Sequence, residues 1–123
     1  MANAEFALSK KEEARLLILG SNGDVAAASK LAMHYDFVVF DTAKAIFWYR
    51  KTAQSGIAEA QRNMGVRISL IDNRACQAEA IYWLKLATEN GEPLASAALD
   101  EVEKRNPSIQ PMPMPPDSGN ECK

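Results

Sequence analysis

The chain has 123 residues and a mass of 13.5 kDa, a size typical of one domain, which excludes a large multidomain enzyme. Apolar residues make up 47% and charged residues 24%, as in an ordinary folded protein with a packed core. The 14 Lys and Arg residues stand against 16 Asp and Glu, giving a formal net charge of -2. We therefore expect no nucleic-acid partner, because a polyanion is held by a basic surface.

Apolar runs and cysteines indicate the compartment. The longest apolar runs, 16–19 and 37–40, have four residues each, far fewer than the roughly 20 that span a membrane. The first residues lack the basic and apolar stretches of a secretory signal, so the sequence predicts a cytoplasmic protein without membrane association. Two cysteines, Cys76 and Cys122, make neither a disulfide framework nor a metal cluster, and we expect both to be reduced.

Good helix formers predominate between residues 9 and 105, where Pro93 is the only proline, and they predict an all-α protein. Glycine just beyond a helix can take the left-handed conformation that closes the last turn. Gly23, Gly56 and Gly91 fit this role. We expect helices over residues 9–20, 24–35, 42–54, 57–68, 77–89 and 93–105.

The ends of the chain differ from its body. Five of the six prolines fall within residues 107–116, where no helix can persist. The sequence therefore predicts a flexible N-terminus over residues 1–8, a helical domain over 9–105 and a Pro-rich disordered tail over 106–123.

Two segments of the chain repeat each other at an offset of 35 residues: 43–56 aligns with 78–91, so that Trp48 falls on Trp83. A similar pattern of positions follows Gly23, Gly56 and Gly91. Each unit reads as a first helix, a connector and a second helix that ends at glycine. Shared positions that are apolar or small predict a core made of Ala27, Leu31, Trp48, Ala60, Met64, Gly65, Trp83 and Leu99.

The stretch from Trp48 to Gly65, together with residues 78–87, resembles the Sel-one-like repeat, a relative of the tetratricopeptide repeat. The resemblance covers about residues 23–99. It implies a short right-handed α-solenoid of antiparallel helix pairs, with about two and a half repeats and capping helices. It also implies protein binding rather than catalysis.

The connectors 36–41 and 69–75 depart from the family's pattern because both lack glycine. The first contains the apolar run Phe37–Phe40. We expect this run to pack into the stack of helices. The alternative is an exposed patch that would mark a partner site.

First helices in such solenoids usually line the concave face, and stacking brings their outward positions into rows. A mixture of cationic, polar and apolar groups at these positions suits an acidic protein surface with an apolar centre. The alternative is a generic amphipathic surface without a partner. The predicted partner-binding residues are Lys30, Met33, His34, Arg62, Asn63, Val66 and Arg67.

Signs of catalysis are sparse. His34 is the only histidine, and no nucleophile motif, metal-ligand set or glycine-rich phosphate loop accompanies it, so we expect no enzyme, cofactor or metal. Dispersed carboxylates, Glu79 among them, are expected on solvated helix faces. Cys76 would be a reactive thiol only if it lay at a helix N-terminus.

The family resemblance makes the function more concrete by analogy. Short acidic members that stand alone look most like bacterial immunity or inhibitor proteins, which occlude a cognate toxin or effector. We expect a monomer or weak dimer of this kind. The alternatives are an adaptor that binds several partners and, more distantly, a small hydrolase using His34.

Overall fold

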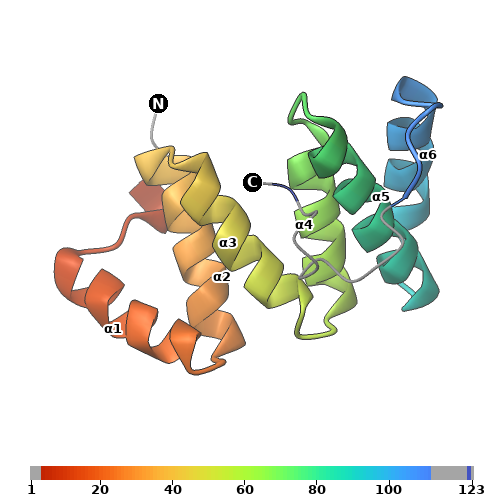
Figure 1. The fold of residues 1–123 in the computed structure, drawn as a ribbon. Helices are drawn as coiled ribbons and strands as arrows, with labels where there is room; N and C mark the ends of the chain where they lie inside the picture. Colours follow the sequence, from red (N-terminus) through yellow and green to blue (C-terminus); the bar gives the residue numbers. More distant parts are fainter. Residues whose placement is uncertain (1–3, 112–121, 123) are drawn as a thin grey trace. The chain divides into compact units, whose positions relative to one another are not determined.

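The computed structural model describes residues 4–111 and Cys122. Within these residues the protein contains six α-helices, a short 3-10 helix and a π-helical turn, without any strand. The predicted all-α class is confirmed. The chain divides into two compact units, Met1–Ser55 and Gly56–Lys123, and each is described by itself (Figure 1).

The first unit is a set of three helices in which α2 packs against both α1 and α3 (Figure 1). A 3-10 helix precedes α1, and a π-helical turn joins α2 to α3. The elements are η1 (Ala4–Phe6), α1 (Lys10–Ser21), α2 (Val25–His34), η2 (Tyr35–Val39) and α3 (Thr42–Ala53).

The second unit also has three helices, with α5 packed against both α4 and α6. Gly65 lets α4 approach α5 closely, because a Cβ there would lie 2.7 Å from Leu84 Cγ and 3.1 Å from the Ala80 carbonyl oxygen. The elements are α4 (Ala58–Ser69), α5 (Arg74–Glu89) and α6 (Ala95–Arg105).

Helix ends follow local sequence signals. The side chains of Ser9, Asp24, Asp41 and Asn73 accept hydrogen bonds from backbone N–H groups in the first turns of α1, α2, α3 and α5, satisfying donors that have no partner inside a helix. The expected bounds agree with the observed ones to within three residues. The largest difference is at α5, which begins at Arg74 rather than at residue 77 because Asn73 caps it.

The three glycines predicted to end helices do so. Gly23, Gly56 and Gly91 have φ angles of 95°, 90° and 86°, the left-handed region in which a side chain would be strained. The predicted helix stops are confirmed, and each glycine separates two helices of the expected pattern.

Most of the predicted core positions are buried. Ala27, Leu31 and Trp48 lie inside the first unit, and Met64, Gly65 and Trp83 inside the second. Ala60 and Leu99 are only partly buried. Leu99 packs on a cluster of Ile81, Leu84 and Val102 in the second unit.

The predicted tail over residues 106–123 lies largely outside the described residues, as do residues 1–3 of the predicted flexible N-terminus. Described residues of the tail pack within the second unit. Ile109 packs on the cluster of Ile81, Leu84 and Val102, and Cys122 is 1% exposed.

None of the described helices is both long and apolar enough to cross a membrane. This agrees with the short apolar runs in the sequence.

Candidate functional site: exposed apolar and basic surfaces

The seven predicted partner-binding residues fall in both units. Lys30, Met33 and His34 lie on α2 of the first unit, and the other four, residues 62, 63, 66 and 67, lie on α4 of the second. Each set is therefore described within its own unit.

On α2, Lys30 is exposed and Met33 is partly exposed. Together with Phe6, Leu8 and Glu12, among others, they line a surface cavity of about 380 Å³. The N-terminal segment therefore borders the predicted binding face of this unit, which the helix pattern alone did not indicate.

His34 has a structural position. It is 6% exposed, and its Nδ1 accepts a hydrogen bond from the Leu8 backbone N–H at 3.2 Å. The ring therefore holds the segment before α1 against α2. The ring does not face solvent as the sequence predicts, because the segment before α1 covers it.

On α4, Val66 is 37% exposed, and Asn63 and Arg67 are partly exposed. Arg62 is engaged within the unit: its Nε lies 2.9 Å from Glu92 Oε2, at ion-pair distance but without hydrogen-bond alignment. Arg62 therefore ties α4 to the segment before α6 as well as bordering the surface. No three His, Cys, Asp or Glu side chains converge as metal ligands within residues 4–111 and 122.

The apolar connector is exposed, contrary to the expectation that it packs. Phe37, Val39 and Phe40 are 41%, 49% and 61% exposed, and we call these three residues the connector patch. Phe37 contacts Phe6, with ring centroids 5.3 Å apart.

Polar residues take the inner side of this turn. Tyr35 and Asp36 are 3% and 8% exposed. The Tyr35 hydroxyl donates to Glu13 Oε2 at 2.6 Å, and Asp36 Oδ2 accepts from the Tyr49 hydroxyl at 2.9 Å. Because these two hydrogen bonds orient the π-helical turn, the apolar residues that follow point outward. The expected packing was wrong for this physical reason.

Phe40 ends the turn in an unusual conformation. Its φ angle is 61°, in the left-handed region that costs roughly 1–2 kcal/mol for a residue with a side chain. The conformation lets the Asp41 backbone N–H donate to the Tyr35 carbonyl oxygen at 2.9 Å. Asp41 then caps α3 through the Lys44 N–H. Phe40 is thus held in a strained conformation while its ring is largely exposed.

Tyr35 makes the first unit sensitive to alkaline pH. Burial and the neighbouring Glu13 carboxylate raise the pKa of its hydroxyl well above the ordinary value of 10.0. The folded state then keeps a proton that the unfolded state loses, so stability falls as the pH rises above the unfolded value. We expect the wild type to lose about 1 kcal/mol more than Tyr35→Phe between pH 10 and 11, measured by urea unfolding.

Tyr82→Phe, in the second unit, is the matched control for that measurement. It removes a tyrosine hydroxyl from the other unit and is unfolded with urea over the same pH range. Parallel curves for the wild type and Tyr35→Phe would contradict the role given to Tyr35.

In the second unit, Cys76 and Cys122 form a disulfide across a sequence separation of 46 residues. The expectation that both are reduced is contradicted. Cys76 lies in the first turn of α5, where its N–H donates to the Asn73 side chain, but it is bonded and 0% exposed, so it is not the free reactive thiol considered from the sequence.

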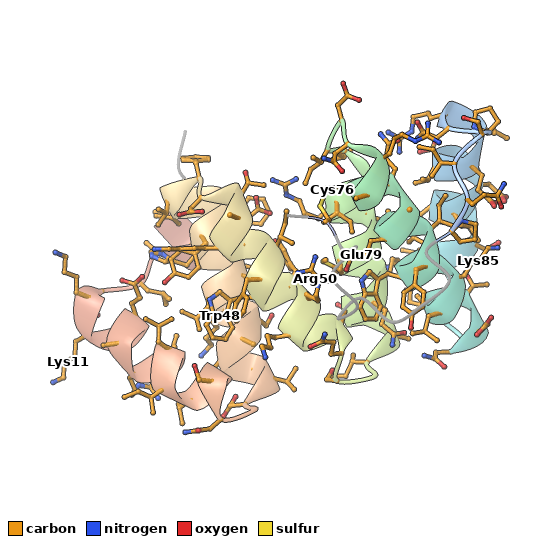
Figure 2. The ribbon with its side chains drawn as sticks, viewed as in Figure 1. Lys11, Trp48, Arg50, Cys76, Glu79 and Lys85 are labelled. Atoms are coloured by element: carbon orange, nitrogen blue, oxygen red, sulfur yellow. A yellow bond between two sulfur atoms is a disulfide. The ribbon has the colours of Figure 1, made fainter. Side chains whose placement is uncertain are left out.

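The buried Glu79 carboxylate binds the backbone of Cys122 to α5. Its Oε1 accepts the Cys122 backbone N–H at 2.8 Å, and its Oε2 accepts the Trp83 indole N–H at 2.8 Å. Glu79 follows Cys76 by one turn on α5 (Figure 2) and is 0% exposed. The expectation of a solvated Glu79 was wrong, because its carboxylate holds a main-chain N–H and an indole N–H inside the unit.

Each of the two units contains three α-helices, and the surfaces described above carry exposed apolar and basic side chains. No family model matches the chain, and no solved structure matches it. The chain is 30% identical over 105 residues to the uncharacterized protein YibG of Escherichia coli (strain K12), an alignment that covers 80% of this chain and 67% of YibG. The chain belongs to the family of YibG.

Proposed function

We propose that the protein is a non-catalytic protein-binding module and that a partner seats on the connector patch. The observation that carries the proposal is the exposure of Phe37, Val39 and Phe40, at 41%, 49% and 61%, beside a buried tyrosine and aspartate. In the free protein, a turn with its polar residues inside and its apolar residues outside gains little stability from the hydrophobic effect. Exposed apolar patches of this kind mark protein interaction sites.

The conformation of Phe40 supports the same surface. A left-handed φ of 61° has a cost that burial of the ring would offset, but in the free protein the ring is 61% exposed. Strained residues that persist at a surface point to a functional role. A partner that covers the ring would supply the missing burial.

The specific role we propose is an inhibitor or immunity protein that occludes a cognate toxin or effector. The resemblance to Sel-one-like repeats supports this role by analogy. It is also the basis for proposing that the helix pairs stack as a right-handed solenoid. A dedicated inhibitor has a single tight partner and a few dominant contact residues, whereas an adaptor binds several partners weakly. Lys30 and Met33, in the same unit as the connector patch, are proposed to contribute secondary contacts.

Substitution of the connector patch tests the proposal. We expect Phe37→Ser with Phe40→Ser to abolish capture of a stoichiometric partner from native lysate and to weaken the purified complex at least about tenfold. The captured protein is identified by mass spectrometry, purified and titrated by calorimetry. Circular dichroism shows whether the variant is folded.

The matched control is Ile18→Ser, because Ile18 is 65% exposed on α1 of the same unit. It should bind the partner as the wild type does. A partner bound equally well by the connector variant would move the site elsewhere, and several weak partners in place of a single one would favour an adaptor.

A further inference from the structure

The outer face of α3 combines positive charge with an exposed ring. Lys44 and Lys51 on this helix are exposed, and the helix itself carries no carboxylate, although the whole chain has a formal net charge of -2. Phe47, on the same helix, is 49% exposed. Positive charge is therefore concentrated beside aromatic surface on an otherwise acidic protein.

Spacing places these residues along one line. Within α3, Lys44, Phe47 and Lys51 follow one another at intervals of three and four residues, which is the period of one helix face. The opposite face of α3 is buried and consists of Ala45, Ile46, Trp48, Tyr49, Thr52 and Ala53. We call the outer set, residues 44, 47 and 51, the basic-aromatic stripe.

The lysines of the stripe contact rings. Lys51 Nζ lies 5.4 Å from the centroid of Phe47, and Lys44 Nζ lies 5.3 Å from the centroid of Tyr35. A cation over a ring keeps its aliphatic stem on apolar surface while its ammonium remains able to meet an incoming carboxylate. Both lysines are exposed, so the stripe presents an aromatic centre between two cations.

From this arrangement we propose that the basic-aromatic stripe docks an acidic amphipathic helix of the partner protein, an inference that rests on the proposed protein-binding function. Lys44 and Lys51 lie two helical turns apart, about 10 Å along the axis. A helix with carboxylates seven residues apart and leucines between them matches both cations and the ring of Phe47. Pairing opposite charges around an apolar contact also selects the orientation of the partner helix.

A protein partner fits these observations better than a nucleic acid or a lipid surface. Polyphosphate binding is driven by many phosphate contacts, whereas the stripe offers two exposed lysines on a protein of formal net charge -2. The exposed ring of Phe47 also needs apolar atoms opposite it, which leucine side chains supply.

The test uses an alanine-rich helical peptide of about 20 residues, with two glutamates seven residues apart and leucines between them. We expect the peptide to shift the ¹⁵N-amide resonances of residues 40–53 in the wild-type protein. Lys44→Glu with Lys51→Glu should weaken its binding at least about tenfold, and raising the salt concentration should weaken wild-type binding. A second peptide with lysines in place of the glutamates should bind the double variant better than the wild type.

The matched control is Lys11→Glu with Lys85→Glu, which makes the same change in net charge at exposed positions on α1 and α5 (Figure 2). This control should bind the glutamate peptide as the wild type does. Phe47→Ala, which removes the central ring without altering charge, should weaken binding as well. Absence of peptide binding, or equal binding by the stripe variant, would overturn the inference.

Two further arms separate this inference from the function on which it rests. If the purified partner is lost by the connector variant but kept by Lys44→Glu with Lys51→Glu, protein binding stands and the acidic-helix inference fails. If both variants keep the partner, the proposed binding site itself fails. Stripe-dependent binding to phosphatidylserine vesicles without binding of the peptide would overturn the inference in favour of a lipid surface.

Discussion

Replacing both Cys76 and Cys122 by alanine is expected to lower the free energy of unfolding by about 4 kcal/mol. The disulfide closes a loop with a sequence separation of 46 residues, and a cross-link of this length removes much of the conformational freedom of the unfolded chain. Small proteins have only about 5–15 kcal/mol of stability in total. The loss would therefore leave the folded state marginal.

Glu79 adds to this effect. Its Oε1 accepts the Cys122 backbone N–H, so release of Cys122 removes a hydrogen bond to a fully buried carboxylate. Loss of one partner from such a group costs about 1–3 kcal/mol. The disulfide and this hydrogen bond should therefore act together, so that their costs are not additive.

Urea unfolding of the oxidised wild type, the wild type with dithiothreitol, and the double alanine variant measures the effect. The reduced wild type and the variant should unfold at similar, lower urea concentrations, and dithiothreitol should leave the variant unchanged. Equal unfolding midpoints for the oxidised wild type and the variant would contradict the stabilising role. Disulfides persist mainly in oxidising compartments, so the reduced measurement also reports the stability that the chain would have in a reducing compartment.

Sequence patterns predicted the features of this protein that depend on neighbouring residues. Helix-forming composition and helix-ending glycines such as Gly23 and Gly91 are local signals, and the observed helices follow them. Gly65 is a predicted core position, and the position of its absent Cβ near Leu84 gives the physical reason why a small residue lies there. The repeat offset likewise identified Trp48 and Trp83, which are both buried.

Features that depend on contacts between distant residues were missed. Nothing near Cys76 in the sequence indicates that Glu79 would hold a main-chain N–H 43 residues later. The same is true of His34, which meets Leu8 across 26 residues. Helical periodicity shows which residues share a face, but it does not show which distant segment covers that face.

The expectation that the connector packs inside was wrong for a different reason. It follows the general rule that apolar residues lie inside, applied to the run Phe37–Phe40. The outcome was decided by Tyr35 and Asp36, whose hydrogen bonds to Glu13 and Tyr49 use the inner side of the turn. A tyrosine and an aspartate directly before the apolar run are the sequence signal that favours the exposed alternative over packing.

Trp83→Ala is expected to destabilise the protein by about 3–5 kcal/mol, the other large effect in this chain. Trp83 is 3% exposed, and its indole N–H donates to Glu79 Oε2 at 2.8 Å. The substitution therefore leaves a cavity and also removes a donor from a buried carboxylate. Trp83→Phe separates the two contributions, because it keeps most of the ring and removes only the donor with part of the volume.

Trp48→Phe is the control for the change in ring size. Trp48 is 5% exposed. Its ring packs closely on Gly20, because a Cβ at Gly20 would lie 2.7 Å from it. Trp48→Phe therefore replaces a buried indole by a smaller ring in the first unit, as Trp83→Phe does in the second. We expect Trp83→Phe to cost about 1–2 kcal/mol more than Trp48→Phe, because only the former leaves a buried carboxylate with one donor fewer. Urea unfolding of the three variants measures the difference. Equal costs for the two phenylalanine variants would mean that the indole hydrogen bond contributes little and that Trp83 stabilises the second unit by packing alone.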